Sequence, residues 1–290
     1  MRVLVTGATG FTGSYVVPLL LRQGAHVRCL VRANSETSRL PLSEIELAFG
    51  DLSEQDSIER ALQGTDALVN IASLGFGHAP NIVNAAIATR VQRAVFISTT
   101  AIFTTLNAPS KAVRLAAEEL VRASGLSYTI LRPTMIYGSS RDRNMCRLIR
   151  YLRRWPLIPV FGRGEHLQQP VYVEDLAAAV VQSLRTEQAM GRSYNVSGPA
   201  PLTYNRIIDT VSEALGRKAR KVHLPAAPLV TALGQLERFS ARLPVKAEQI
   251  LRLNEDKAFD PGEAIKDFGY SPRPFAEGIK LELQEMGMSR

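Results

Sequence analysis

The sequence predicts an α/β protein with a doubly wound parallel sheet and a smaller, partly interleaved C-terminal α/β lobe. Three observations support this fold class. Short β-branched runs alternate with helical segments through the first half of the chain, and a glycine-rich loop joins the first strand to the first helix. After about residue 138 the alternation loosens, and proline and glycine become frequent. The change in pattern indicates a second lobe beside the main sheet.

The strand candidates are almost continuously apolar, as strands are when helices cover both faces of a parallel sheet. They are "RVLVT" (2–6), "HVRCLV" (26–31), "IELAFG" (45–50), "ALVNIA" (67–72), "RAVFIS" (93–98) and "SYTILR" (127–132). Segments of helical period separate them, at 13–24, 57–64 and 111–125, and each ends in glycine, where helices commonly stop. Such alternation with short links predicts right-handed βαβ crossovers.

Helical patterns return later in the chain, at 174–188, 203–216, 246–254 and near the C-terminus. We therefore predict a nucleotide-binding domain over residues 1–165. Residues 166–290 are predicted to form the substrate-side region, partly interleaved with the sheet.

Composition excludes some classes of protein. At 46% hydrophobic and 21% charged residues, the chain is not expected to be disordered. Its two cysteines, Cys29 and Cys146, are too few for a disulfide framework and suggest reduced thiols in the cytoplasm. A strand starting at Arg2 leaves no room for a signal peptide, and no apolar run approaches the roughly 20 residues of a spanning helix. The net charge of +8 favours an anionic partner without identifying it.

The loop "VTGATGFTG" (5–13) has glycines three residues apart, at Gly7, Gly10 and Gly13. In a dinucleotide-binding loop the first glycine allows the tight turn, the second lets the backbone approach a pyrophosphate, and the third allows close helix–strand packing. The N-terminus of the following helix offers free N–H groups and a positive dipole end to the phosphates. Its place between a strand and a helix predicts a dinucleotide site.

The end of the second strand should select the cofactor. Arg32 stands there, where an acidic residue would bind the ribose hydroxyls of NAD. An arginine can clamp a 2′-phosphate or stack on adenine, although it can also be a plain surface residue. We expect NADP, with NAD as the second choice. Asp51 follows the third strand, at the expected adenine edge, where a simple turn aspartate is the alternative.

Seven motifs in the order of the family, the glycine loop among them, resemble the short-chain dehydrogenase/reductase superfamily, in its extended and atypical branches. They are "TGATGFTG", "GDL" with "GTDALVNIA" (64–72), "VFISTTAIF" (95–103), Lys111 heading its helix, "YTILRPTMIYG" (128–138), "QPVYVEDLAAAV" (169–180) and "GRSYNVSGPAPLT" (191–203). The resemblance covers nearly the whole chain. It implies a Rossmann domain followed by a small substrate lobe, in an oxidoreductase or epimerase acting on a nucleotide sugar or similar carbonyl compound.

Site residues carry over by position from this resemblance. The implied pyrophosphate cradle is Gly7, Thr9, Gly10, Phe11, Thr12 and Gly13. The implied adenosine site is Arg32, Asp51 and Leu52, and the nicotinamide side is Ala72, Lys111 and Pro133. Thr100 corresponds to the catalytic Ser/Thr of the family, with Thr99 as a competitor, and Lys111 would bridge the ribose hydroxyls.

The sequence departs from the family at its catalytic tyrosine, which stands four residues before the lysine and is here Asn107. A tyrosine hydroxyl can exchange a proton beside the hydride carrier, whereas an amide cannot titrate. Either another donor serves, such as Tyr137, a threonine or a water held by Lys111, or the chain only binds its cofactor. The second alternative is that of NmrA-like regulators and of an accessory subunit of respiratory complex I.

The segment "RDRNMCRLIRYLRRWPLIP" (141–159) predicts a basic amphipathic helix. Its repeating arginines are Arg143, Arg147, Arg150 and Arg154. They can form a solvated face, contact a substrate diphosphate, or lie on an anionic membrane with Trp155 at the interface, which would suit a lipid-linked sugar. No nucleic-acid motif accompanies the charge, so we expect a small-molecule substrate and no nucleic acid. The resemblance adds a possible homodimer through helices of the Rossmann domain.

Overall fold

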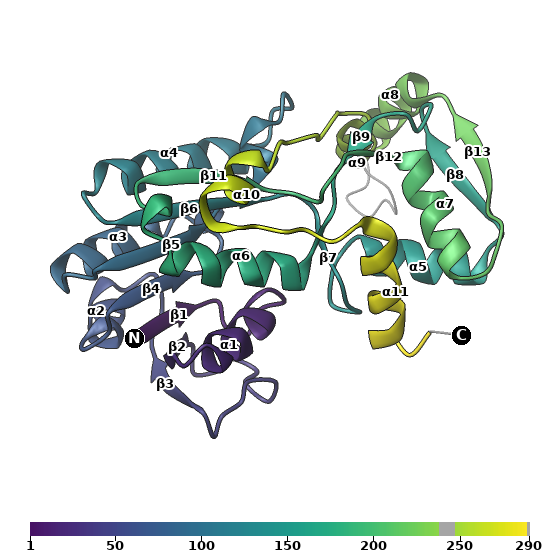
Figure 1. Cartoon of the computed structure of the whole chain (residues 1–290). Coiled ribbons are helices and arrows are strands. Elements are labelled where there is room, and N and C mark those ends of the chain that lie inside the picture. The colour runs from purple at the N-terminus through teal and green to yellow at the C-terminus, as the bar shows by residue number, and fades with distance from the viewer. Residues whose placement is uncertain (238–246, 289–290) are drawn as a thin grey trace.

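The structure is a computed structural model that describes residues 1–237 and 247–288. A helix-covered sheet forms one part of the molecule, and a smaller, mainly helical lobe lies beside it (Figure 1). Residue 246, the first of a predicted helical stretch, lies outside the described residues. In the described part of the chain no helix is both long enough and apolar enough to cross a bilayer.

The central sheet has seven parallel strands in the order β11-β6-β5-β4-β1-β2-β3. Their bounds are β1 Arg2–Thr6, β2 His26–Val31, β3 Ile45–Phe49, β4 Ala67–Asn70, β5 Arg93–Ile97, β6 Tyr128–Pro133 and β11 Arg192–Val196. The winding direction reverses between β1 and β4, and ligands of such sheets bind beyond the carboxyl ends of the strands at this point. The doubly wound fold class predicted from the sequence is confirmed.

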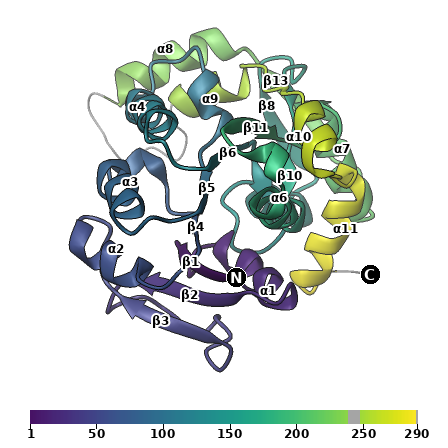
Figure 2. The ribbon, with the colours of Figure 1, turned by 60° about the vertical axis from the view of Figure 1, so that its left-hand side comes forward.

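Helices cover both faces of this sheet (Figure 2). On β1, Val3 and Val5 pack into one core with α1, α6 and α10, whereas Leu4 faces the opposite core with α2, α3 and α4. This alternation explains why the strands read as continuously apolar. The helices span α1 Gly13–Arg22, α2 Gln55–Leu62, α3 Ala79–Ala88, α4 Pro109–Ala123, α6 Val173–Arg185 and α10 Gly262–Phe268.

The smaller lobe has a third core, formed by side chains from well-separated parts of the sequence, including Tyr137, Ile149, Ile208 and Ile279. Its helices span α5 Met145–Arg154, α7 Tyr204–Ala214, α8 Ala226–Leu236, α9 Ala247–Leu253 and α11 Phe275–Glu285. Its short strands are β7 Ile136–Tyr137, β8 Leu157–Phe161, β9 Leu167–Gln168, β10 Val171–Tyr172, β12 Leu202–Thr203 and β13 Arg220–Leu224. Short 3₁₀ turns are η1 Leu74–Phe76, η2 Thr100–Phe103 and η3 Glu187–Ala189.

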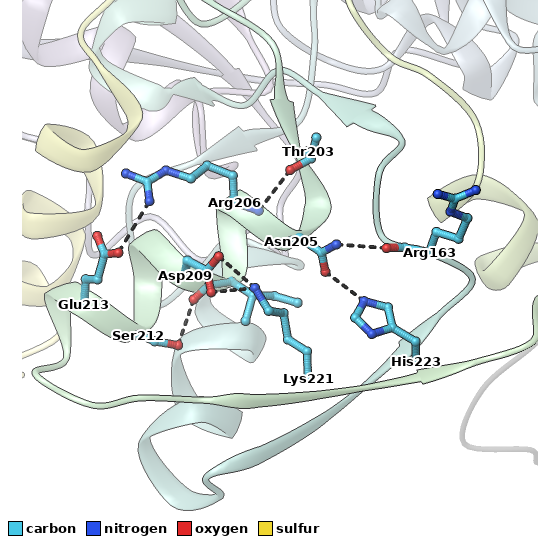
Figure 3. Close-up of polar contacts among 10 residues, drawn as sticks. Arg163, Thr203, Asn205, Arg206, Asp209, Ser212, Glu213, Lys221 and His223 are labelled. Atoms are coloured by element: carbon cyan, nitrogen blue, oxygen red, sulfur yellow. Dashed lines mark hydrogen bonds and ion pairs between the residues drawn. The ribbon is translucent and has the colours of Figure 1, made fainter.

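Polar contacts fasten β13 and the β8 end to α7 within this lobe (Figure 3). Lys221 on β13 forms an ion pair with Asp209 on α7, at 2.6 Å. Asn205, at the start of α7, donates to the Arg163 carbonyl and pairs with the His223 ring at 3.2 Å. These bonds hold the outer wall of the lobe against α7, which lines the cavity described below.

The chain passes repeatedly between the two parts. After β6 it enters the smaller lobe through β7, α5 and β8, returns with α6 and β11, leaves again, and comes back as α10 before ending in α11. Hydrogen bonds between residues far apart in the sequence fix the last passage, the segment between α10 and α11. The Arg273 backbone N–H and guanidinium both donate to the buried Asp175 carboxylate, at 2.9 and 2.8 Å.

Candidate cofactor and substrate site

The glycine-rich loop follows β1 and begins α1, and its geometry requires glycine at two positions. Gly7 has a φ of +70°, and a Cβ there would lie 2.7 Å from the Ala72 nitrogen. A Cβ on Gly13 would lie 2.3 Å from the Gly7 carbonyl oxygen. Gly10 is exposed, so its backbone can be approached from outside. The loop therefore fits a phosphate group held against the backbone.

The N-terminus of α1 is not capped by a side chain, and its first turn has no acidic residue. Its positive dipole end is open to an anion, although the Ser14 and Tyr15 N–H groups already bond the Gly10 and Thr12 carbonyls. Thr12 is the N-cap residue and is itself largely buried. Phe11 packs edge-on against Tyr15 one turn into the helix, which orients the loop. The predicted cradle residues therefore come together around one helix end.

The predicted adenosine side lies at the carboxyl ends of β2 and β3. Arg32 is exposed just after β2, and Asp51 follows β3. Hydrogen bonds from the Ser53 backbone and hydroxyl lower the pKa of Asp51, and the nearby positive charge of Arg32 adds to this effect. The Leu52 carbonyl accepts a hydrogen bond from Asn81 of α3. Arg32 and Asp51 are thus neighbours, at the edge of the sheet that also holds the glycine loop.

The predicted nicotinamide side is built on β5 and β6. The Thr100 hydroxyl donates to the Pro133 carbonyl at 3.3 Å, which joins the ends of these two strands. Lys111 stands in the first turn of α4, and its ammonium donates to the Thr104 carbonyl at 2.6 Å. Asn107, in the place of the family tyrosine, is exposed. Lys111 therefore also fixes the loop that contains Asn107 to the start of α4, through this bond to Thr104.

A buried ionic cluster supports this region from behind. Glu118 of α4 is completely buried and accepts hydrogen bonds from the Ser98 hydroxyl and the Arg132 guanidinium. Burial favours a higher pKa for Glu118, but the hydrogen bonds from Arg132 and Ser98 outweigh it, and the pKa is lowered. The Arg132 guanidinium also lies over the Phe103 ring, 5.3 Å from its centroid. The ionised Glu118 thereby fixes the end of β5 and the adjoining η2 turn.

A cavity of about 650 Å³ lies between the sheet and the smaller lobe. Thr99, Thr100 and Thr134 line it from the carboxyl ends of β5 and β6, so it adjoins the predicted nicotinamide side. Apolar side chains form much of the opposite wall: Met135, Met145, Leu148, Phe161, Ile207, Ile250 and Leu253. A cavity of this size is typical of small-molecule sites.

Cationic side chains also line the cavity. Of the four arginines that the sequence placed on one basic helix, Arg143 and Arg147 line it. Neither forms an ion pair in the described part of the chain. Arg150 instead donates to the Ser140 carbonyl, and Arg154 is exposed. One end of the cavity therefore offers two guanidinium groups to an anionic substrate group.

The cavity contains titratable groups that the sequence interpretation missed. Lys257 lines the cavity, and burial lowers its pKa, with the Arg252 charge adding to the effect and Glu255 opposing it. Burial raises the pKa of Tyr204, which also lines the cavity. Neither residue belongs to a motif that marks it in the sequence. Only the fold brings the 254–260 segment against the η2 turn, where Glu255 accepts hydrogen bonds from the Thr104 and Thr105 hydroxyls.

The position of Tyr137 corrects one expectation. Only 1% of this residue is exposed, and it packs in the core of the smaller lobe between Tyr172 and Phe275. Its hydroxyl donates to the Phe275 carbonyl at 3.4 Å, and burial raises its pKa well above the usual range. A hydroxyl so enclosed cannot reach a substrate in the cavity. Tyr137 is therefore a packing residue and not a candidate proton donor.

The comparisons with known proteins agree with this geometry. The sequence profile of a family described as NAD(P)H-binding matches residues 7–187. A mitochondrial NADH dehydrogenase [ubiquinone] 1 alpha subcomplex subunit 9 from Dictyostelium discoideum is 27% identical, over 95% of this chain and 82% of its own length. A ceramide reductase from Caulobacter vibrioides is 28% identical, over 96% of this chain and 88% of its own.

Among solved structures, the UDP-glucose 4-epimerase of Thermus thermophilus in complex with NAD superposes with a TM-score of 0.75. It covers 99% of both chains at 23% identity, a level that establishes the fold alone. The profile match extends over more than half of the chain, from the glycine loop through α6. The chain therefore belongs to the NAD(P)H-binding family, and its fold is that of the Rossmann proteins.

Proposed function

We propose that this protein is an NADP-preferring oxidoreductase or epimerase whose substrate is a carbonyl or alcohol compound bearing a phosphate or diphosphate, as a nucleotide sugar does. The observation that carries the proposal is the cavity. It adjoins the ends of β5 and β6 on one side and presents the unpaired Arg143 and Arg147 on the other. Guanidinium groups bind phosphate oxygens strongly and with defined geometry.

The residues divide into three tasks. The Thr99 hydroxyl, which itself accepts from the Ala101 N–H, donates to the reacting oxygen of the substrate at the end of β5, and Thr100, whose hydroxyl donates to the Pro133 carbonyl, holds the two strand ends beside it. Arg143 and Arg147 hold the phosphate end and so orient the carbonyl. The glycine loop, Arg32 and Lys111 bind the cofactor, which supplies or accepts the hydride when bound.

We assign the proton transfer to Lys257, because Asn107 cannot titrate. In the reductive direction, in which the bound cofactor would supply the hydride, the Lys257 ammonium gives a proton to the substrate oxygen, which becomes a hydroxyl. The neutral amine then takes a proton from water. A lowered pKa makes the ammonium a better acid at neutral pH. General acid–base help is typically worth about 10²–10⁴-fold in rate.

Substrate turnover tests the proposal. NADPH oxidation is measured against keto-sugar nucleotides and against the same carbonyl compounds without phosphate. The double variant Arg143→Gln/Arg147→Gln should raise KM for the phosphorylated compounds about ten- to a hundredfold or more, because charged hydrogen bonds are lost. The control Arg153→Gln/Arg154→Gln removes two exposed arginines of the same helix and should change little. Equal effects of the two double variants would contradict the proposal.

The proton assignment has its own measurement, the pH dependence of kcat. Lys257→Met should lower kcat and remove the decline of kcat as pH rises through the lowered pKa of this lysine. Lys257→Arg, which keeps the charge but not an accessible proton, should behave like the methionine variant. A native pH profile retained in Lys257→Met would show that another group donates the proton.

A second function is favoured by the exposed Asn107: a catalytically silent cofactor-binding protein. The relative from Dictyostelium is named as a subunit of an NADH dehydrogenase. Tight NADP(H) binding together with no oxidation of NADPH by any compound of the panel would support this second function.

A further inference from the structure

Arg141 extends from the segment after β7 to the glycine loop, although its position in the sequence is remote from that loop. One terminal nitrogen donates to the Ser14 hydroxyl and the other to the Thr9 carbonyl, both at 2.9 Å. The Ser14 hydroxyl in turn donates to the Phe11 carbonyl at 2.8 Å. The guanidinium is thus fixed at the mouth of the loop, beside the first residues of α1.

The electrostatics of this arrangement are unfavourable without a ligand. The N-terminus of α1 carries the positive end of the helix dipole, where a cation is destabilising and an anion is stabilising. Both acceptors of Arg141 are neutral, and in the described structure no carboxylate lies within ion-pair distance of it. The charge of Arg141 acts on the Glu285 carboxylate and opposes the rise in its pKa that burial causes, but Glu285 bonds the Tyr15 hydroxyl and forms no ion pair with the guanidinium in the described structure. A half-buried cation at a positive helix end is therefore only partly balanced, and an anion bound on the loop would complete the balance.

The donor geometry also leaves capacity for a ligand. A guanidinium has five N–H groups, and the two bonds to the loop use two of them. The remaining groups can donate to the oxygens of an anion lying on the glycine loop. The exposed Gly10 leaves that face of the loop open.

We propose that Arg141 is a phosphate-binding residue of the cofactor site, contributed by the smaller-lobe side of the chain. It places a fixed positive charge over the pyrophosphate cradle and completes a site that the loop and α1 begin. The position also links two sites, because Arg143 lies two residues further on and lines the substrate cavity. The segment between β7 and α5 thus supplies one arginine to the cofactor and another to the cavity.

The test is calorimetric binding of NADPH and ADP-ribose to the full chain, without substrate. Arg141→Gln keeps a donor for the Thr9 carbonyl but loses the charge, and it should weaken both ligands about ten- to a hundredfold. Arg141→Lys should retain part of the affinity. The matched control is Arg150→Gln, which removes the same charge from a residue that bonds the Ser140 carbonyl. It should bind as the native protein does.

Two further measurements separate ligand binding from a purely structural role. The unliganded Arg141→Gln and Arg150→Gln proteins should melt at similar temperatures, and added salt should weaken ADP-ribose less in Arg141→Gln than in the native chain. Affinity within twofold of native for Arg141→Gln, or equal losses in both variants, would overturn the proposal. The proposal would also be overturned if the native protein did not bind ADP-ribose. These experiments measure binding and not turnover, so they can support or contradict the role of Arg141 whether or not the protein has the proposed enzymatic activity.

Discussion

In the short-chain dehydrogenase/reductase superfamily, which the sequence resembles, a Tyr–Lys pair combines proton transfer by the tyrosine with cofactor binding by the lysine. Here the lysine is Lys111, and Asn107 stands in the place of the tyrosine. The lysine remains in the first turn of α4, whereas the side chain four residues earlier is an exposed amide. An ammonium can hydrogen-bond ribose hydroxyls whether or not a tyrosine accompanies it. Retention of the lysine therefore fits cofactor binding, and in the proposed reaction another group would have to transfer the proton.

The first prediction concerns this pair. Lys111→Ala should weaken NADP(H) binding about tenfold, because it removes a charged donor from the nicotinamide side. Asn107→Ala, in the loop just before α4, should leave cofactor binding nearly unchanged and serves as the matched control. Titration of cofactor affinity for the two variants checks this. If Lys111→Ala binds NADP(H) like the native chain, the assigned ribose contact is wrong.

Arg32 supports a second prediction at this scale. Its exposed guanidinium is free to clamp a 2′-phosphate, so NADPH should bind more tightly than NADH, and Arg32→Ala should shrink that preference about ten- to a hundredfold. The side-by-side comparison of the two cofactors is the measurement, with Arg39→Ala, another exposed arginine, as control. If the native protein binds NADPH and NADH with equal affinity, the predicted role of Arg32 is wrong.

At the scale of elements, α5 and α11 meet through two buried carboxyl groups. One oxygen of Asp142 bonds the Asn144 and Cys146 backbone N–H groups, just before and within the first turn of α5. Its other oxygen and both oxygens of Glu282 have no donor in the described structure. Burial and the neighbouring Asp142 raise the pKa of Glu282 to about 10. A Glu282 carboxyl that keeps its proton can donate it to Asp142 and so join the two elements.

This pair of carboxyl groups predicts how the free energy of unfolding depends on pH. The folded state keeps the Glu282 proton while the unfolded state loses it above about pH 4.5, so the contribution of this group to stability falls as pH rises from about 4.5 to about 10. Glu282→Gln can donate to Asp142 without a proton to lose. It should be more stable at pH 8, on the order of 1–3 kcal/mol, and its stability should depend less on pH.

Denaturant unfolding at several pH values measures this effect. Glu277→Gln, an exposed carboxylate on the same helix, is the control and should follow the native curve. A Glu282→Gln variant that is less stable than native at pH 8 would show that the carboxyl pair is not protonated in the folded chain.

The elements differ in how far the sequence predicts them. Periodicity predicted six of the seven strands of the central sheet and the helices α1, α2, α4 and α6 on it, because alternate residues of each strand enter different cores. It did not predict β11 or α3. It failed for contacts that depend on distant segments. Asp175 lies in the first turn of α6, and its carboxylate accepts from Arg273, which approaches it only after the chain has returned from the smaller lobe.

The site shows the same division. The cradle glycines are recognisable because their spacing follows from local backbone geometry. Tyr137 reads as an available phenol, but α11, from the far end of the sequence, encloses it. Lys257 and Arg141 could not be selected from the sequence, because neither has a local pattern and both act through tertiary placement.

At the scale of the whole molecule, one side of the sheet presents apolar side chains to solvent. On α3, Ile87 is 46% exposed, and on α4, Val113 and Leu115 are 40% and 36% exposed. These two helices pack side by side over one face of the sheet. We expect a homodimer that buries this surface, as apolar patches of this kind often mark interfaces.

Light scattering with size-exclusion chromatography tests the dimer. Val113→Lys/Leu115→Lys should give a folded monomer, because two charges would be buried without partners. Ile265→Lys changes an equally exposed residue on α10 and should remain dimeric. A native protein that runs as a monomer at high concentration would refute the assembly.

The repeated passage of the chain between its two parts has a consequence for how the protein folds and how it can be divided. A fragment that stops near residue 165 keeps six strands of the large sheet but lacks β11, α6 and α10, so only α1 remains to cover one apolar face of the sheet. The complementary fragment lacks β7, α5 and β8, which form much of the third core. The first fragment keeps the core between the sheet and α2, α3 and α4, but neither fragment contains all the side chains of the other two cores. The two parts are therefore expected to melt in one cooperative transition, and removal of either would cost the other its fold.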